Sequence, residues 1–343
     1  MEPFTHALAS VALARTRPKL LPRFGLAMLI GSGVAPDLDY ASYWGGAGAF
    51  LRFHRTLFHS IPGAALTTCA MAAAFCALDK QWNGKTPQKS PTIPFTCVSA
   101  LAVCAVGWGG HILLDLASGE GLQLLWPFRV HWTAWNLVAN FDPWVLLLLI
   151  GGLLLPQLFR LVGEEIGTHR RSKAGAGTAI FTLLLLGAYL GARADLRSRA
   201  IDLLLSSEYR GHEPLAAGAF PWSANPLNWR GVVSTDNTME ELLVPLSSPA
   251  DFNAGRSLTH YKPEESPALE AAEKTESAQR FLKYAEFPLA SVGRREDGYR
   301  FELRDVRFPA RNASPANVIV RVDLDSSLRV TREQYRYASS CDP

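Results

Sequence analysis

Charged residues are scarce in this 343-residue chain, at 19% of positions, against roughly 25% in an average soluble protein. The shortage lies in the first part: the 147 residues from Arg197 onward hold 40 of the 65 charged residues, which leaves 25 for the first 196. Basic residues are not in large excess either, since Lys and Arg number 34 against 31 Asp and Glu. That balance argues against a nucleic-acid partner. The composition predicts a membrane-embedded domain over 1–196 and a soluble domain over 197–343.

Cysteine is also sparse, with five residues in all. Four of them lie inside apolar runs, which favours small packing residues over a disulfide framework: Cys69, Cys76, Cys97 and Cys104. The fifth, Cys341, is in the polar half of the chain. The amino terminus lacks the order of a cleavable signal peptide, because its basic residues follow the apolar stretch instead of preceding it. We therefore expect these first residues to belong to the mature protein.

The charge-poor part of the chain contains long apolar segments. Four of them reach or approach the roughly 20 residues that a helix needs to cross a bilayer, and each predicts a transmembrane helix: 57–78, 93–116, 142–162 and 177–196. Two shorter stretches, 5–14 and 20–34, predict a short helical hairpin packed inside the bundle. The first 196 residues therefore predict a polytopic helix bundle.

The tail after residue 196 has the patterns of a small soluble domain. Alternation of apolar and polar residues predicts strands over 299–308 and 318–324. The segment 266–284 has helical composition, with apolar residues at Leu269, Ala272 and Phe281. The fold class expected for the whole chain is mainly α, a transmembrane helix bundle followed by a small α+β domain.

Basic residues orient the bundle through the positive-inside rule. They gather in two connectors that share a side and in the tip of the short hairpin: Lys80, Lys85 and Lys89; Arg170, Arg171 and Lys173; Arg15, Arg17, Lys19 and Arg23. That side is predicted to be cytoplasmic, which leaves 36–56, 117–141 and the soluble domain outside the plasma membrane. Four tryptophans on the outer side are typical of an interfacial belt, although ordinary packing residues would look the same: Trp126, Trp132, Trp135 and Trp144.

Histidine and aspartate gather in the charge-poor part of the chain. Ionisable groups buried near hydrocarbon must pair or bind a metal ion to offset the loss of hydration, so such a group indicates a functional site. The predicted topology brings these residues to helix ends on the outer side: His6, Asp37, Asp39, His54, His59, His111, Asp115 and Asp142. Mixed histidine and carboxylate ligands suit a divalent metal such as zinc, with manganese or iron as alternatives.

Each of these residues also has an ordinary structural explanation. His111 and Asp115 share a helix face at i,i+4 spacing, where they can ligate an ion or form a simple hydrogen-bonded pair. Asp37 and Asp39 can cap a helix after Pro36. Their convergence at one level of the membrane favours a metal site, so we predict as ligands His6, Asp37, Asp39, His59, His111 and Asp115, with His54 and Asp142 as further ligands or as residues that orient a ligand.

Several short motifs resemble the bacterial inner-membrane, predicted metal-dependent hydrolases of the YdjM-like group. In the first part they are Thr5-His6, Pro-Asp-Leu-Asp at 36–39, His-Arg-x-x-x-His-Ser at 54–60, His-Ile-Leu-Leu-Asp-Leu at 111–116, Leu-Leu-Trp-Pro-Phe at 124–128 and Asp-Pro at 142–143. In the tail they are Asn-Pro-Leu-Asn-Trp-Arg-Gly-Val-Val at 225–233 and Arg-Asp-Val-Arg-Phe at 304–308. The resemblance spans nearly the whole chain and implies a metal-dependent hydrolase of the inner membrane.

A more distant similarity is to the all-helical fold of zinc-dependent phospholipase C and single-strand nucleases. Asp37 or Asp39, His59 and the His111/Asp115 pair match parts of its zinc cluster. The chain has neither a recognisable His-x-x-x-Glu nor a ligand Trp at its start, so a site for one or two metal ions is expected instead of a trinuclear centre.

Three functions remain in view. In the first, a metal-activated water hydrolyses a lipid or lipid-linked phosphoester, with Asp39 and Arg55 in catalytic roles and membrane lipids or a small molecule as partners. Arg55 would stabilise developing negative charge instead of binding the metal. In the second, the same side chains pass an ion or a proton through a transporter or channel component. In the third, the metal only staples a non-catalytic membrane scaffold. The sequence does not indicate an oligomeric state.

Overall fold

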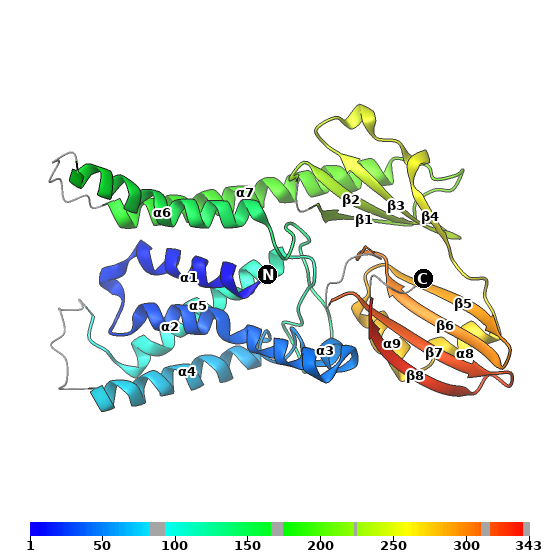
Figure 1. Ribbon diagram of the computed structural model, residues 1–343, viewed down its shortest axis with the longest axis horizontal. Helices are drawn as coiled ribbons and strands as arrows, with labels where there is room; N and C mark the ends of the chain where they lie inside the picture. Colours follow the sequence, from blue (N-terminus) through cyan, green and yellow to red (C-terminus); the bar gives the residue numbers. More distant parts are fainter. Residues whose placement is uncertain (83–92, 166–173, 223–224, 310–315, 339–343) are drawn as a thin grey trace. The chain divides into compact units, whose positions relative to one another are not determined.

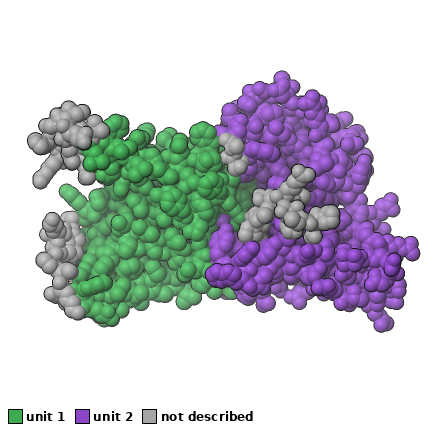
Figure 2. All heavy atoms as spheres, viewed as in Figure 1, with its two compact units in different colours: residues 1–38, 57–126, 133–193 green, residues 39–56, 127–132, 194–343 purple. Residues whose placement is uncertain are grey.

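The computed structural model describes residues 1–82, 93–165, 174–222, 225–309 and 316–338. They form two compact units (Figure 2). Unit 1 contains residues 1–38, 57–126 and 133–193, and unit 2 contains residues 39–56, 127–132 and 194–343. Two segments that lie between predicted membrane helices, 39–56 and 127–132, thus belong to the same unit as the C-terminal tail.

Unit 1 is helical. Its elements are α1 (Pro3–Thr16), η1 (Pro18–Leu20), α2 (Gly25–Val34), the first residues of η2 (Ala35–Gly45), α4 (Ile61–Trp82), α5 (Cys97–Ala117), α6 (Pro143–Glu165) and the first part of α7 (Ala174–Leu205). Successive helices run in alternating directions, so α1, α4 and α6 begin at the end of the unit where α2 and α5 finish (Figure 1). This is the arrangement that the predicted topology requires for the helix ends bearing histidine and aspartate.

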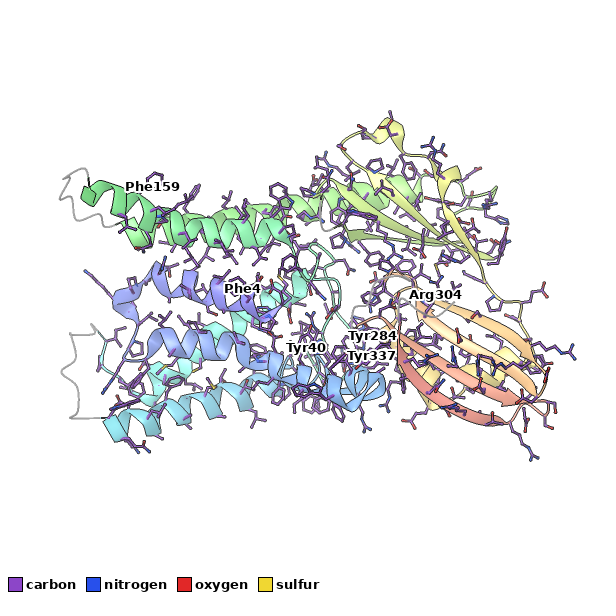
Figure 3. All side chains as sticks on the ribbon, viewed as in Figure 1. Phe4, Tyr40, Phe159, Tyr284, Arg304 and Tyr337 are labelled. Carbon is purple, nitrogen blue, oxygen red and sulfur yellow. A yellow bond between two sulfur atoms is a disulfide. The ribbon has the colours of Figure 1, made fainter. Side chains whose placement is uncertain are left out.

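Three helices are long and apolar enough to cross a membrane. They are α4, α5 and residues Gly175–Leu205 of α7. The predicted span 142–162 corresponds to α6, whose described apolar part, Pro143–Phe159, is shorter than a span requires. Large side chains such as Phe159 remain exposed on α6 (Figure 3). The helices α4, α5 and α7 thus carry the membrane character of the chain, and a crossing by α6 stays a prediction.

Glycines set the distance between α2 and its neighbours. A Cβ added to Gly33 would lie 2.2 Å from Ser10 Oγ of α1, and a Cβ added to Gly107 of α5 would lie 2.1 Å from Ser32 Oγ and 2.8 Å from the Leu29 carbonyl oxygen of α2. A side chain at Gly107 would therefore displace the backbone of α2, and one at Gly33 would displace the hydroxyl of Ser10. The backbones of α1, α2 and α5 therefore approach closely beside the residues that end α2.

The cysteine prediction is wrong for two residues. Cys76 of α4 and Cys97, the first residue of α5, form a disulfide, with their Cα atoms 5.9 Å apart. The antiparallel packing of α4 and α5 brings together two positions that are 21 residues apart in sequence. Cys104 is a buried packing residue, as predicted, and Cys69 is exposed. Cys341 lies outside the described residues.

Unit 2 combines short helices with two four-stranded antiparallel sheets. The first sheet has the order β1-β2-β3-β4 and the second β5-β6-β7-β8. The strands are β1 (Ala216–Pro221), β2 (Asn228–Ser234), β3 (Thr238–Pro245), β4 (Leu258–Tyr261), β5 (Pro288–Arg295), β6 (Gly298–Asp305), β7 (Val318–Asp325) and β8 (Val330–Tyr337). The helices are α3 (Ala47–Phe53), η3 (Pro249–Asp251), η4 (Ala254–Arg256), α8 (Pro267–Glu273) and α9 (Glu276–Tyr284).

The second sheet follows the predicted alternation. Phe301 and Leu303 of β6 and Val320 and Val322 of β7 are buried in one cluster with Phe281 of α9, while the residues between them are partly exposed. The helical segment predicted over 266–284 forms α8 and α9. These observations confirm the expected fold class, a helix bundle followed by a small domain of helices and antiparallel strands.

An ion pair across β6 and β7 gives a test of acid stability. Arg300 and Asp323 face each other in register, with Arg300 Nε donating to Asp323 Oδ1 at 2.7 Å and Nη2 to Oδ2 at 3.1 Å. The hydrogen bonds from Arg300 lower the pKa of Asp323 in the folded state. The ion pair therefore stabilises the folded protein fully above about pH 4, the pKa of aspartate in the unfolded chain. This stabilisation is lost as the pH falls through the lower pKa that Asp323 has in the folded state.

Replacing Asp323 by Asn should accelerate amide exchange in β6 and β7 at pH 7, because the charged partner of Arg300 is lost. The difference from wild type should shrink as the pH falls below about 4. Glu270→Gln, which removes the exposed pair with Lys274, is the matched control and should have little effect at any pH. If the difference in exchange rate between Asp323→Asn and wild type grew as the pH fell, folding would not lower the pKa of Asp323.

Candidate metal centre

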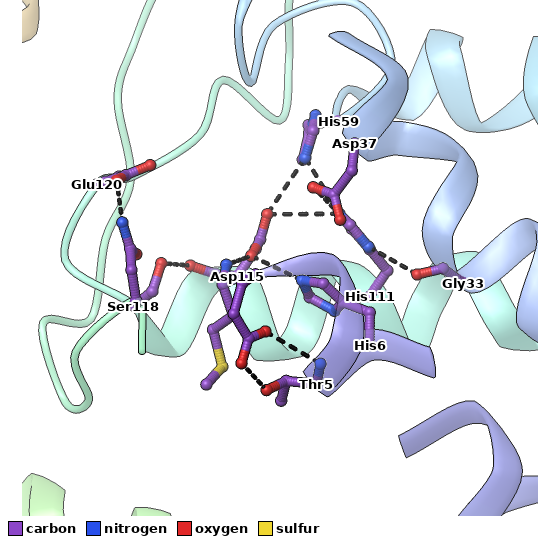
Figure 4. Close-up of polar contacts among 12 residues, drawn as sticks. Thr5, His6, Gly33, Asp37, His59, His111, Asp115, Ser118 and Glu120 are labelled. Carbon is purple, nitrogen blue, oxygen red and sulfur yellow. Dashed lines mark hydrogen bonds and ion pairs between the residues drawn. The ribbon is translucent and has the colours of Figure 1, made fainter. Parts of the chain in front are cut away.

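Five buried side chains meet at the end of unit 1 where α1 begins and α5 ends (Figure 4). His6 lies on α1, Asp37 follows α2 in η2, His59 precedes α4, and His111 and Asp115 lie one turn apart on α5. None of the five is more than 6% exposed. Four elements far apart in sequence therefore supply one polar group in an otherwise apolar bundle.

Asp115 is the centre of this group. Its Oδ1 lies 3.2 Å from His6 Nε2, and its Oδ2 lies 3.2 Å from His59 Nε2 and 3.4 Å from His111 Nε2. The rings of His6 and His111 stack, with centroids 3.8 Å apart. Atoms of His6, Asp37, His111 and Asp115 all lie within 4.8 Å of one another, a grouping that could hold a metal ion.

A hydrogen bond fixes how His111 presents its ring. His111 Nδ1 lies 2.9 Å from the carbonyl oxygen of Gly33, which can only accept, so Nδ1 carries the proton of the neutral ring. His111 Nε2 then presents a lone pair toward His59 Nε2 at 3.1 Å. A backbone carbonyl that orients a histidine in this way is the usual support of a metal-binding imidazole.

Asp37 has no hydrogen-bond donor for either carboxylate oxygen among the residues that the structure describes. Its nearest ion-pair partner is His111 Nε2, 3.9 Å from Oδ1, which is too long for a hydrogen bond. Burial raises the pKa of Asp37 above its ordinary value. A buried carboxylate without donors costs free energy unless a proton or a cation accompanies it, so Asp37 has the environment of a metal ligand.

His6 is suited to the same role. Burial, together with the neighbouring His111, lowers the pKa of His6 to about 3, so its ring is neutral near pH 7. Metal binding requires a neutral imidazole, because only the deprotonated nitrogen has a free lone pair. Within the described part of the chain, His6 Nδ1 is buried without a hydrogen-bond partner.

The dimensions of the group bear on how many ions fit. Histidine and carboxylate bonds to zinc are about 2.1 Å long, so two ligand atoms of one ion lie at most about 4.2 Å apart. The separations around Asp115 and His111, 3.2 to 3.9 Å, are within this limit, and all ligand atoms of the group lie within 4.8 Å of one another. The four residues therefore fit one ion after a small contraction, or two neighbouring ions.

Three other predicted site residues form a group of their own in unit 2. Asp39 Oδ1 lies 2.8 Å from His54 Nδ1, and Asp39 Oδ2 accepts the backbone N–H of Arg55 at 2.8 Å. His54 and Arg55 are almost fully buried, and Arg55 has a left-handed φ of 56°. The carboxylate of Asp39 thus orients the His54 ring and fixes the turn at Arg55, and its role as a metal ligand stays a prediction.

Asp142 has a structural role in unit 1. Its Oδ1 accepts the backbone N–H groups of Trp144 at 2.9 Å and Val145 at 3.1 Å, which caps the first turn of α6. The hydroxyl of Tyr189 approaches both carboxylate oxygens at 3.4 Å. These contacts account for a buried aspartate at this position, and a part in metal binding stays a prediction.

Two polar features near the cluster were not predicted. The amino group of Met1 contacts Asp115 Oδ1, and the buried Glu120 accepts a hydrogen bond from the Asn140 side chain. Glu120 follows α5 in a Gly-Glu-Gly sequence, and a glutamate between two glycines is typical of an exposed turn. The sequence therefore does not indicate that Glu120 is buried. The Met1 contact depends on where α1 begins in space, which no sequence pattern reveals.

Comparison with known proteins agrees with the two parts of the chain. Residues 1–197 match the family model described as YdjM inner membrane protein, and residues 267–338 match that of the YfhP C-terminal alpha/beta plait domain. One curated relative is the uncharacterized protein YfhP of Bacillus subtilis (strain 168), 21% identical over 344 residues, with 96% of this chain and 93% of the relative covered. No solved structure gives a significant match. Because the first model covers more than half of the chain, the protein belongs to the YdjM inner membrane protein family.

Proposed function

We propose that the protein is a membrane-bound, zinc-dependent hydrolase that acts on a phosphoester of a lipid or a lipid-linked molecule. The observation that supports this most is the environment of Asp37, a buried carboxylate without hydrogen-bond donors among the described residues, facing the lone pair of His111 Nε2. A simple hydrogen-bonded His–Asp pair would leave no such carboxylate. A cation between the two groups satisfies both of them.

The residues divide into two roles in this proposal. His6, Asp37, His59, His111 and Asp115 hold the metal, which would lower the pKa of a bound water toward neutrality and so supply the nucleophile. Asp39 keeps His54 and the turn at Arg55 in place, and the guanidinium of Arg55 stabilises the developing phosphoryl charge. The chain itself links these roles, since one residue separates Asp37 from Asp39 and three separate Arg55 from His59.

Exposed aromatic residues in unit 1 support a substrate from the membrane. Phe141, directly before α6, is 61% exposed, and Trp144 in its first turn is 42% exposed. Trp135, in the segment between α5 and α6, is also exposed. Tryptophan at a helix end is typical of the lipid–water boundary, and α6 begins at the end of the unit that holds the metal cluster (Figure 1). A phosphoester headgroup lies at this same level of a bilayer.

Metal analysis coupled to a phosphoester screen tests the function. Protein purified in detergent should contain zinc and release product from vesicles of phosphatidylglycerol and phosphatidylethanolamine or from bis(p-nitrophenyl) phosphate. Dialysis against a chelator should abolish turnover, and added zinc should restore it. Asp39→Asn should lower turnover while zinc remains bound, because Asp39 acts through His54 and Arg55. Protein without bound transition metal would contradict the proposal.

Two other functions give different results in the same preparation. A transporter would move zinc into reconstituted vesicles, and this flux would disappear in Asp115→Asn. A metal-stapled scaffold would hold zinc but hydrolyse none of the phosphoesters, because a closed coordination sphere leaves no position for water. We prefer the hydrolase because the described polar cluster lies at one end of unit 1, whereas an ion pathway needs polar groups at successive depths.

We also propose that the C-terminal tail lies outside the cytoplasm. The supporting charges are Lys80, at the end of α4, and basic residues in the connectors 83–92 and 166–173, which lie outside the described residues. If these connectors are cytoplasmic, α7 delivers the tail to the opposite side. In cells whose other four cysteines are Ala, an impermeant maleimide should label Cys341 without lysis. Labelling only after lysis would place the tail in the cytoplasm and remove the argument for an outer-leaflet substrate.

The disulfide provides an independent readout of the same orientation. Cys76 and Cys97 lie toward the connector 83–92, the side that the charges assign to the cytoplasm, where disulfides rarely persist. The proposed orientation therefore requires that this pair, which is bonded in the structure, be reduced in growing cells, and thiol trapping in wild-type cells quenched with acid measures its state. A disulfide recovered from growing cells would instead place this end of unit 1 on the oxidising side and reverse the proposed orientation.

A further inference from the structure

The segment 39–56 packs on the C-terminal domain, although it lies between α2 and α4 in the chain. Ala47 and Leu51 of α3 belong to the same buried cluster as Leu269 of α8, Phe281 of α9 and Val320 of β7. The helix α3 has only seven residues, too few to be stable without a packing partner. Its conformation therefore depends on the domain formed by residues 267–338.

Strand β8 supplies the most direct contacts. The rings of Tyr43 and Tyr337 stack with centroids 4.9 Å apart, and the Tyr337 hydroxyl donates to the Tyr43 carbonyl oxygen at 3.3 Å. A Cβ added to Gly48 would lie 2.8 Å from Cδ2 of Tyr335, so α3 touches this ring with its backbone. Two tyrosines near the end of the described chain thus contact α3 and the segment before it. Tyr337 is labelled in Figure 3.

The aromatic contacts continue from β8 to the predicted catalytic residues. Phe50 lies edge-on to Tyr337 at 6.2 Å and stacks on the ring of His54 at 4.2 Å. Tyr40 contacts the same imidazole edge-on at 4.4 Å. His54 in turn binds Asp39, which accepts the backbone N–H of Arg55. An unbroken series of side-chain contacts therefore joins Tyr337 to the Asp39 group within unit 2.

We propose that the C-terminal α/β domain is a positioning device, in which Tyr337 and Tyr335 hold α3 and so fix Asp39, His54 and Arg55 for the reaction. This proposal rests on the proposed function, because it assigns these three residues to turnover. It gives the domain a defined task and makes Tyr337 and Tyr335 positioning residues that touch neither metal nor substrate. It also predicts that metal binding, which uses residues of unit 1, is independent of the contact.

Tyr337→Ala removes the ring that stacks on Tyr43 and contacts Phe50. Hydrogen exchange of peptides covering 43–56 should become at least about tenfold faster, since α3 loses its support. The kcat for bis(p-nitrophenyl) phosphate should fall roughly tenfold to a hundredfold with little change in KM, because the substrate still binds but the reacting groups are misplaced. Zinc content should equal that of wild type.

Three further variants separate positioning from general damage. Tyr337→Phe keeps both ring contacts and should restore most of the lost kcat. Gly48→Leu should reproduce the effect of Tyr337→Ala, because its side chain would push α3 away from Tyr335. Tyr261→Ala is the matched control, since this tyrosine of β4 is 69% exposed and belongs to the other sheet.

The outcomes distinguish this proposal from the proposed function. Unchanged exchange over 43–56 in both Tyr337→Ala and Gly48→Leu would show that the domain does not hold the segment. Faster exchange with unchanged kcat would show that the contact exists but does not position the reacting groups. Either result overturns the positioning proposal and leaves the hydrolase intact. Wild-type protein without turnover or bound zinc overturns the hydrolase itself and, with it, the assignment of these residues to catalysis.

Discussion

Replacing Asp115 by Asn should remove bound zinc from the protein and abolish phosphoester turnover. Asp115 lies within 3.4 Å of the Nε2 atoms of three histidines, so the change removes the negative charge shared by the whole cluster. The amide has nearly the same shape as the carboxylate, but its nitrogen has no lone pair for a metal. We expect zinc affinity to fall on the order of a hundredfold or more, measured by metal analysis after dialysis against a weak chelator.

Asp79→Asn is the control for this experiment. Asp79 is a largely buried carboxylate near the other end of α4, where it pairs with Arg23 at 3.3 Å. The variant changes the same chemical group in the same unit without affecting the predicted ligands, so zinc content and turnover should remain at wild-type levels. Equal zinc in Asp115→Asn and wild type, with both proteins folded by circular dichroism, would show that the cluster is not the metal site.

Replacing Arg55 by Lys should lower kcat by roughly a hundredfold to a thousandfold while zinc remains bound. Lysine keeps the positive charge but loses the planar guanidinium that can donate two hydrogen bonds to a phosphoryl group. The backbone of residue 55 has a left-handed φ, and its N–H still donates to Asp39 in the variant. The loss should therefore appear in turnover instead of in metal content.

Arg52→Lys, on the last turn of α3, is matched to this change. Arg52 is exposed, and its guanidinium lies over the ring of the neighbouring Phe53. Turnover in this variant should stay within about twofold of wild type, as expected for a surface substitution. If Arg52→Lys and Arg55→Lys lose activity equally, the loss reflects a general effect of replacing arginine in this segment and not a specific role of Arg55.

The convergence of buried histidine and aspartate could be predicted from sequence because it depends on helix ends; that the group binds a metal stays a prediction. Apolar runs long enough for a bilayer show where each helix starts and stops, and alternating helix directions then place His6, Asp37, His59 and Asp115 at one end. The i,i+4 spacing of His111 and Asp115 adds a local constraint that any α-helix obeys. None of these steps requires knowledge of side-chain packing, so they bring the residues to one end of the bundle but do not separate the His6–Asp37–His111–Asp115 group from Asp39 with His54 or from the cap Asp142.

The docking of α3 could not be predicted in this way. Its partners are far along the chain, since Tyr337 comes 294 positions after Tyr43, and no periodicity links the two segments. Strand β2 was missed for a different reason: Trp229, Val232 and Val233 are all buried, so the strand lacks the alternation that reveals a half-buried one. The sequence does contain a signal for the capping role of Asp142, because Asp followed by Pro is common at the start of a helix. Its position among other acidic residues of the membrane domain led instead to the prediction of a metal ligand.

The close approach of α1, α2 and α5 at Gly33 and Gly107 has a consequence for the kinetics of metal exchange. These glycines allow α1 and α5, which bear predicted ligands, to pack closely against α2, which leads into Asp37, and the predicted ligand side chains are almost fully buried. An ion held there can leave only when the helices separate, and its residence time is set by that opening instead of by the strength of single bonds. Removal of zinc by a chelator, and its return, should therefore be slow and should follow the rate at which this end of the bundle opens.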